Sequence, residues 1–314
     1  MTNTWYSSSL VLCHNLVYSS IAGSHSTTLN KKSLASYPMA VCNDGTPAAY
    51  YASDQVEGWA GMVVYLQEGG GCISVEDCNA RCQVYSPGLC TEDTAEEHEF
   101  DYTMWSEDPE ENPPFHNFYK IFVPYCSSDL YTGTRNASEE TGNYFFHGKF
   151  IVQAVVEDIM RNTPGITELK QFVLIGGSAG AFGVGYNCDL VAKFIQTDLN
   201  SEVDVRCIAD GGDFYPTWVS REGCDPYIIG KYASEFWASV LDSSCEALSE
   251  PDSLDCLILP SYFQYIATPM MVVTNYVAVH QCTPPVDQDT KFWDIWMDQM
   301  MVLANTFIQV NNDK

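Results

Sequence analysis

Short apolar runs recur along the chain, and most of them end in glycine or another turn-forming residue. Runs of this length without polar alternation are typical of strands that are buried on both faces of a parallel sheet. Apolar residues at helical spacing occur at 150–160 and again at 293–307. Strands that alternate with helices predict an α/β fold with a mostly parallel sheet and helices on both faces. The expected strands lie at 48–52, 61–66, 119–126, 172–175 and 270–274, and a further strand with its turn lies at 205–212.

Polar regions set the expected limits of the domain. Residues 1–34 are rich in Ser, Thr and Asn and lack a clear period, so we expect a leader or a disordered N-terminus. Residues 35–314 then form a single domain. Residues 92–111 contain ten acidic residues and no Lys or Arg, which predicts a solvated insertion or lid outside the core. Residues 217–265 are predicted to be helical and irregular.

The run at 172–175 leads into Gly176-Gly177-Ser178-Ala179-Gly180, which fits the G-x-S-x-G pattern of a nucleophile elbow. In such an elbow the chain reverses sharply between a strand and a helix, and side chains two residues away from the serine would clash. The pattern therefore predicts that Ser178 is a nucleophile. The alternative is a small-residue loop that only packs a helix on a strand.

A second glycine-rich segment, Gly69-Gly70-Gly71, follows the run at 61–66. In folds with a nucleophile elbow, the oxyanion hole uses the N–H after the nucleophile and another N–H from the loop after an early strand. We therefore expect Ala179, Gly70 and Gly71 to form the oxyanion hole around Ser178. The alternative for the glycine segment is a tight turn that binds no ligand.

The base that should activate the serine is not visible. In the expected chain order an Asp or Glu and then a His follow the nucleophile. His280 is the sole histidine after Ser178, and it stands where the acidic residue is expected. His280 acting as a displaced base is one hypothesis. His147 is predicted to be structural, and His98 is predicted to be solvated within the acidic segment.

Charge and cysteine content limit the environment and partners. The chain has 41 acidic and 14 basic residues, a formal charge of −27, which argues against nucleic acid and anionic membranes as partners. No apolar run is long enough for a transmembrane helix. Thirteen cysteines without C-x-x-C pairs predict disulfides and a secreted protein, and predict no metal site. Asn136-Ala137-Ser138 is an N-glycosylation sequon, which favours a secreted glycoprotein.

Several segments together resemble the pectin acetylesterase family, which also contains Notum-type carboxylesterases. Residues 66–72 resemble its Leu-Glu-Gly-Gly-Gly-Trp-Cys motif, and residues 177–180 match Cys-Ser-Ala-Gly. Residues 40–50 resemble the family's opening, 123–126 its Tyr-Cys stretch, and 210–212 its Asp-Ala-Gly. The resemblance runs co-linearly from about residue 38 to 282.

This resemblance implies an α/β-hydrolase-like, secreted serine carboxylesterase with disulfide-containing insertions and no cofactor. It would remove an acetyl or fatty-acyl group from an acylated polysaccharide or an acylated protein through an acyl-Ser178 intermediate. The chain also departs from the family. Aligned on Gln281, the position of the triad Asp is Ala278, the Trp after the glycines is absent, and no segment corresponds to the one that carries the triad His.

These departures leave two main alternatives. The chain is either an esterase whose domain is incomplete at its C-terminal end, or a non-catalytic secreted relative that binds a glycan or an acylated ligand. A disulfide-rich extracellular structural protein is a third reading.

Overall fold

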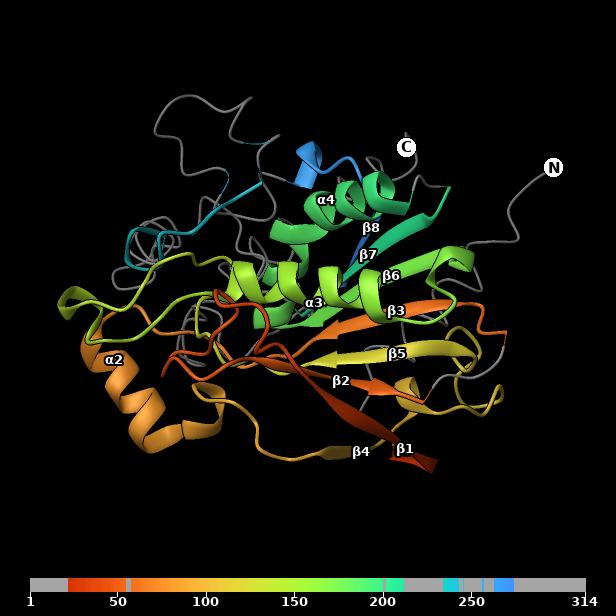
Figure 1. The fold of residues 1–314 in the computed structure, drawn as a ribbon, viewed down its shortest axis with the longest axis horizontal. Coiled ribbons are helices and arrows are strands. Elements are labelled where there is room, and N and C mark those ends of the chain that lie inside the picture. The colour runs from red at the N-terminus through yellow and green to blue at the C-terminus, as the bar shows by residue number, and fades with distance from the viewer. Residues whose placement is uncertain are drawn as a thin grey trace, which may run out of the picture.

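The computed structural model of the chain describes residues 22–54, 58–199, 202–211, 234–242, 245, 256 and 263–273. Its centre is an eight-stranded sheet in the order β4-β1-β2-β5-β3-β6-β7-β8 (Figure 1). The strands are β1 (Ala22–Ser33), β2 (Ala49–Ser53), β3 (Gly61–Leu66), β4 (Glu97–Tyr102), β5 (Phe118–Val123), β6 (Gln171–Gly177), β7 (Asp204–Asp210) and β8 (Met270–Val273).

The sheet is mixed, and its larger part is parallel. Strands β5, β3, β6, β7 and β8 pair in parallel with one another, whereas β2 runs antiparallel to β5 and to β1, and β1 runs antiparallel to β4. The prediction of a mostly parallel α/β sheet is therefore confirmed. Every residue of β5 is buried, as expected for an apolar run inside a covered sheet.

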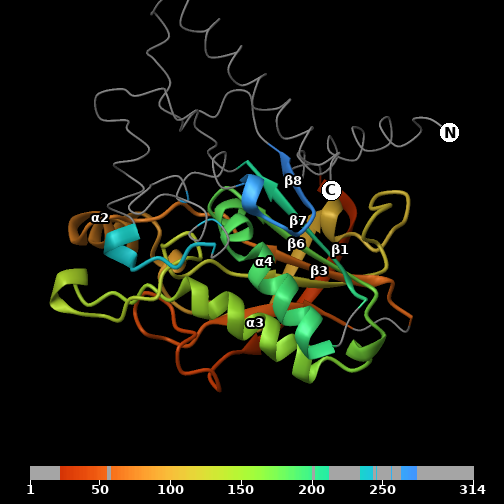
Figure 2. The same ribbon diagram turned by 90° about the horizontal axis from the view of Figure 1, so that it is seen from above.

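Two long helices, α3 (Gly148–Asn162) and α4 (Ala179–Leu199), lie on the same face of the sheet (Figures 1 and 2). Alternate strand residues such as Val64 and Leu174 point toward these helices and join their apolar residues in the main core. In the described part of the chain, no long helix covers the opposite face. The helix predicted at 293–307 lies outside the described residues.

Short helical segments connect the main elements. The helix α2 (Val75–Ala80) continues into η1 (Arg81–Tyr85) and is followed by η2 (Pro87–Leu89). The others are η3 (Thr103–Trp105), η4 (Glu139–Thr141), η5 (Ile166–Glu168) and η7 (Phe263–Tyr265). None of the described helices is long and apolar enough to cross a lipid bilayer.

The expected N-terminal limit of the domain is wrong. Residues 22–33, which the sequence placed outside the fold, form β1 and pair with both β2 and β4. Backbone hydrogen bonds hold this strand, and they do not depend on apolar side chains. Its Leu29 side chain is fully buried in a small aromatic cluster.

The acidic segment at 92–111 is also more ordered than its charge suggested. It contains the strand β4, and the side chains of Met104 and Trp105 are buried. The prediction of a solvated segment outside the core is therefore wrong for these residues. The reason is that apolar and aromatic residues stand between the charges and pack on the sheet. The exposed carboxylates are those of Glu96, Glu97, Glu99, Glu107 and Glu110.

The prediction that the cysteines form disulfides is confirmed. Among the described residues, five bonds link ten cysteines. Cys13, Cys224 and Cys282 lie outside the described residues. Among the described residues, no group of three or more His, Cys, Asp or Glu could hold a metal ion. The pairs are Cys42–Cys126, Cys72–Cys78, Cys82–Cys90, Cys188–Cys207 and Cys245–Cys256.

A buried carboxyl group fixes the start of α3. Asp129 is fully buried and accepts hydrogen bonds from the Ser127 hydroxyl at 2.7 Å, the Gly148 N–H at 2.7 Å and the Tyr131 N–H at 3.1 Å. Burial raises the pKa of Asp129 to about 6, against the opposing effect of these hydrogen bonds. A Cβ at Gly148 would lie 2.1 Å from Asp129 Oδ1. Only glycine can stand at this helix start.

We predict that Gly148→Ala lowers the free energy of unfolding by roughly 2–4 kcal/mol, because the added methyl group overlaps the buried carboxyl group. Denaturant unfolding of the oxidised protein, followed by tryptophan fluorescence, measures the change. Gly88→Ala is the matched control, since nothing lies within 4 Å of the position of its Cβ. Equal stabilities of the two variants would contradict this account of α3.

Candidate active site

Ser178 lies between β6 and α4 in a strained turn. Its φ is +47°, in the left-handed region that non-glycine residues rarely adopt, and the residue is exposed. The turn is fixed by backbone hydrogen bonds from the Ser178 N–H to the Asp210 carbonyl at 2.9 Å and from the Ala181 N–H to the Ser178 carbonyl at 2.9 Å. The predicted strand, turn and helix around the serine are therefore present.

The flanking glycines are required by backbone packing. A Cβ at Gly176 would lie 2.3 Å from the carbonyl oxygen of Gly180, and a Cβ at Gly180 would lie 2.0 Å from the carbonyl oxygen of Leu66. Both distances are far below van der Waals contact, so side chains larger than hydrogen are excluded. The crowding expected from the G-x-S-x-G pattern is what the structure shows.

The glycine loop and the elbow meet at the same edge of the sheet. Leu66 at the end of β3 pairs with Gly176 at the end of the parallel strand β6, so the segments that follow the two strands leave the sheet side by side. Gly70, which has a φ of +70°, and Gly71 are both exposed in this loop. Ala179 is the first residue of α4, and its N–H has no acceptor within its own helix. These are the groups that the sequence assigned to an oxyanion hole.

Hydrogen bonds from other segments hold the loop that carries the glycines. The Arg81 Nε–H donates to the Ser128 hydroxyl at 2.8 Å, and its guanidinium lies 5.8 Å from the centre of the Tyr125 ring. The Cys72 N–H donates to the Ser128 carbonyl at 3.1 Å. The Trp237 indole N–H donates to the Cys72 carbonyl at 2.6 Å. The backbone of the glycine loop is thus held by groups from distant parts of the chain.

Two carboxyl groups beside the elbow were not predicted as site residues. Asp210 ends β7 and pairs in register with Gly177, while Glu68 begins the glycine loop. Glu68 accepts a hydrogen bond from the Tyr65 hydroxyl at 3.1 Å. Burial, and then the charge of Glu68, raise the pKa of Asp210 to about 6. Each residue stands at the carboxyl end of a predicted strand, but β6 lies between those two strands, so no signal in the sequence showed that the two carboxyl groups meet.

The histidines with described side chains are engaged elsewhere. His147 is buried, with Nδ1 2.8 Å from the Met39 carbonyl and Nε2 3.1 Å from Asn136 Oδ1, and burial lowers its pKa. The structural role predicted for it fits these contacts. His116 Nδ1 lies 3.2 Å from the Pro113 carbonyl. His280, together with Ala278 and Gln281, lies outside the described residues.

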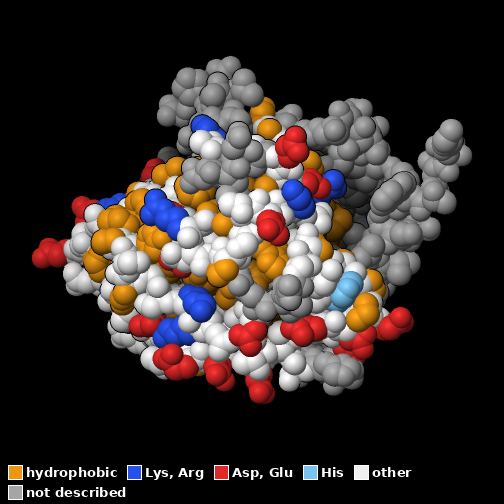
Figure 3. Space-filling view, turned by 45° about the vertical axis from the view of Figure 1, so that its right-hand side comes forward, with side chains coloured by type: hydrophobic (Ala, Val, Ile, Leu, Met, Phe, Trp, Pro, Cys, Tyr) orange, Lys and Arg blue, Asp and Glu red, His pale blue; other side chains and the backbone are white. Residues whose placement is uncertain are grey.

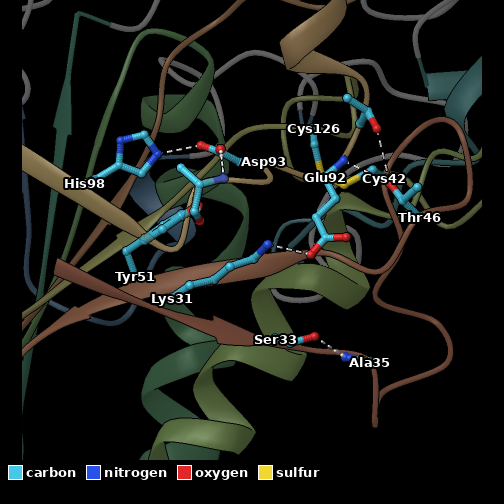
Figure 4. Close-up of polar contacts among 12 residues, drawn as sticks. Lys31, Ser33, Ala35, Cys42, Thr46, Tyr51, Glu92, Asp93, His98 and Cys126 are labelled. Atoms are coloured by element: carbon cyan, nitrogen blue, oxygen red, sulfur yellow. Dashed lines mark hydrogen bonds and ion pairs between the residues drawn. A yellow bond between two sulfur atoms is a disulfide. The ribbon is translucent and has the colours of Figure 1, made fainter.

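His98 is less solvated than predicted. Its Nε2 lies 2.5 Å from Asp93 Oδ2, and its ring packs edge-on against Tyr51 with centroids 4.5 Å apart (Figure 4). Close by, Lys31 Nζ lies 2.8 Å from Glu92 Oε1 (Figure 4). The start of the acidic segment is therefore fastened to β1 and β2. The ring of His98 in this pair contacts Tyr51, Phe100 and Phe122, which belong to β2, β4 and β5.

The fold and the elbow define a protein of the α/β-hydrolase-like class. The sequence model of the family described as Pectinacetylesterase matches residues 23–294, and the chain belongs to this family. The family resemblance inferred from sequence motifs is confirmed.

Known relatives share this region of the chain. The chain is 29% identical over 239 residues to palmitoleoyl-protein carboxylesterase notum1a of Danio rerio. The alignment covers 74% of this chain and 47% of that protein. It is 27% identical over 257 residues to pectin acetylesterase 5 of Arabidopsis thaliana, covering 81% of the chain and 58% of that protein. The chain thus spans about half the length of the curated relatives it matches.

A solved structure has the same fold. The Wnt deacylase Notum from Drosophila superposes with a TM-score of 0.77 at 23% identity, covering 88% of this chain and 82% of that one. At this identity the likeness establishes the architecture.

We predict that Asp210→Asn stabilises the protein at pH 7.5 by about 1–2 kcal/mol and that the gain disappears near pH 4. The sign follows from the raised pKa of Asp210 in the folded state, about 6 against an ordinary value of 3.8. The folded protein holds a proton that the unfolded chain releases, so this residue's contribution to stability falls as pH rises from about 4 to above 6. Chemical unfolding at both pH values measures the effect.

Asp204→Asn is the control, because Asp204 lies at the opposite end of β7 with 46% of its side chain exposed and pairs with Arg206 at the surface. This variant should show no such pH-dependent gain. A loss of stability in Asp210→Asn that is equal at both pH values would contradict the assignment.

Proposed function

We propose that this chain is a serine carboxylesterase that removes an O-linked acyl group through an acyl-Ser178 intermediate. The observation that carries the proposal is the elbow: Ser178 is exposed, has a φ of +47°, and stands beside the glycine loop at residues 69–71. A packing turn has no need of an exposed serine in a strained conformation. Membership of a family whose named relatives are carboxylesterases supports the same conclusion.

The reaction would proceed in two steps. Ser178 Oγ attacks the carbonyl carbon of the ester and loses its proton to a base, while the carbonyl oxygen becomes an oxyanion. The N–H groups of Ala179 and of Gly70 or Gly71 donate to that oxyanion. Collapse of the intermediate expels the alcohol, which takes the proton, and water then hydrolyses the acyl-serine by the same path in reverse.

We propose that the base of this mechanism is a residue outside the described part of the chain. His280 is the candidate offered by the sequence, since it is the sole histidine after Ser178. The described histidines contact Met39, Pro113 and Asp93 instead.

The names of the relatives and the charge of this chain suggest the substrate class. One group of relatives is named for palmitoleoyl-protein and another for pectin acetyl esters. The formal charge of −27, with acidic side chains along the lower margin of the surface in Figure 3, disfavours a polyanionic polymer. We therefore propose an acylated protein or a weakly charged, acylated polysaccharide as substrate. Five disulfides in the described residues support action outside the reducing cytosol.

Labelling with a fluorophosphonate probe tests the proposal. The purified protein should take up one equivalent of probe, and Ser178→Ala should abolish labelling and lower hydrolysis of p-nitrophenyl esters by about a thousandfold or more. Ser33→Ala serves as control, because Ser33 is exposed and its hydroxyl only accepts a bond from the Ala35 N–H at 3.3 Å (Figure 4).

A series of p-nitrophenyl esters from acetate to palmitate then reports the preferred acyl length. Folded protein that neither labels nor hydrolyses any of them would overturn the esterase and favour a non-catalytic relative that binds acylated ligands.

A further inference from the structure

A cavity of about 420 Å³ lies on the face of the sheet that α3 and α4 leave uncovered. Its floor includes Ile175 of β6 and Ile208 of β7, which alternate along their strands with residues that point toward the helices, such as Leu174. Tyr102 and Glu68 at its margin are exposed, so the cavity reaches the surface. The volume is within the usual range for small-molecule sites. Ser178 and the proposed oxyanion donors are not among its described lining residues.

Aromatic rings form much of the wall. Phe100 packs on Trp105 with centroids 4.6 Å apart and on Phe122 with centroids 4.9 Å apart. Tyr65 stacks on Phe122 at 6.2 Å and meets Trp105 edge-on at 6.0 Å. These rings come from three separate strands and from η3, and they hold one another in place. They present a fixed aromatic surface to the cavity.

The polar part of the wall is acidic. Glu68 and Asp210 both line the cavity, and no Lys, Arg or His is among its described lining residues. After burial, the charge of Glu68 is the second cause of the raised pKa of Asp210, which is consistent with two neighbouring carboxyl groups, and the described lining residues offer them no cation. A neutral occupant would leave this repulsion in place, and an anion would add to it.

We infer that this cavity is a second ligand site, distinct from Ser178, that binds a small organic cation of the quaternary ammonium class. Such a cation is attracted to the faces of aromatic rings and to carboxylates at the same time, and its alkyl groups fill apolar space. A metal ion fits the chemistry less well, because it needs oxygen or nitrogen ligands around it and the aromatic walls supply few. The aromatic walls and the acidic pair thus point to one ligand class.

Calorimetric titration with choline, against its neutral isostere 3,3-dimethylbutan-1-ol, tests the inference. Choline should bind saturably at one site, and the isostere should bind at least about tenfold more weakly, because the two differ mainly in charge. Asp210→Asn and Glu68→Gln should each weaken choline binding by roughly tenfold. Asp204→Asn, which removes an exposed carboxylate at the far end of β7, should leave binding unchanged.

The titrations are run on the whole chain and repeated with Ser178→Ala, so that the result does not depend on esterase activity. Circular dichroism confirms that each variant is folded. If Asp210→Asn misfolds, choline binding by Glu68→Gln, a substitution at the exposed margin of the cavity, tests the inference alone. Absence of choline binding to folded protein would overturn the inference. Equal binding of the isostere, or choline binding that neither carboxyl substitution weakens, would do so as well.

Discussion

The close approach of α4 to the end of β3 is the constraint on which the candidate site depends. With hydrogen as the side chain of Gly180, the helix backbone reaches the Leu66 carbonyl, and with Gly176 before it the chain can reverse within one residue. Ser178 is left as the apex of the turn, with a φ that the surrounding backbone imposes. The glycine loop that continues from Leu66 is thereby brought beside the start of α4. The position of the nucleophile and that of its proposed oxyanion donors follow from a single backbone contact.

The surrounding loops are connected to one another by contacts between residues far apart in the sequence. Asp129 links the loop after β5 to the start of α3, and Arg81 links that loop to the helix that follows the glycines. The Cys42–Cys126 disulfide, which spans 84 residues, fastens the same loop to the turn before β2. A site that must hold donors to within a fraction of an ångström gains from such cross-connection, since each loop alone would be mobile.

Features that depend on local sequence were predictable. The strands β3, β5 and β6 are buried almost throughout, and they were predictable because such parallel strands are apolar along most of their length. The strands β7 and β8 are only partly buried and were predictable from their apolar residues. The elbow was predictable because any sequence that forms this turn needs glycines where a side chain would clash with the backbone.

Features that depend on pairing were not predictable. The strand β1 is polar and is held by its neighbours' backbones, and β4 is acidic on one face. The meeting of Glu68 with Asp210 depends on strand order, because β3 and β7 lie on opposite sides of β6. No spacing along the chain records that adjacency. The contacts of His98 with Asp93 and Tyr51 were likewise not predictable from the sequence, because they require β4 to lie beside β1.

The acidic strand at the margin of the sheet also governs how molecules of this protein meet one another. In the described sheet, β4 is the terminal strand, with one row of backbone N–H and C=O groups facing away from β1. Glu97 and Glu99 are exposed along it. Two copies approaching edge to edge would bring like charges together before their backbones could pair, which discourages polymerisation through the sheet. Salt weakens this barrier, because at about 0.1 M ionic strength charges are screened beyond roughly 10 Å. The residues that make this segment look like a loop in the sequence thus protect the sheet from adding another strand.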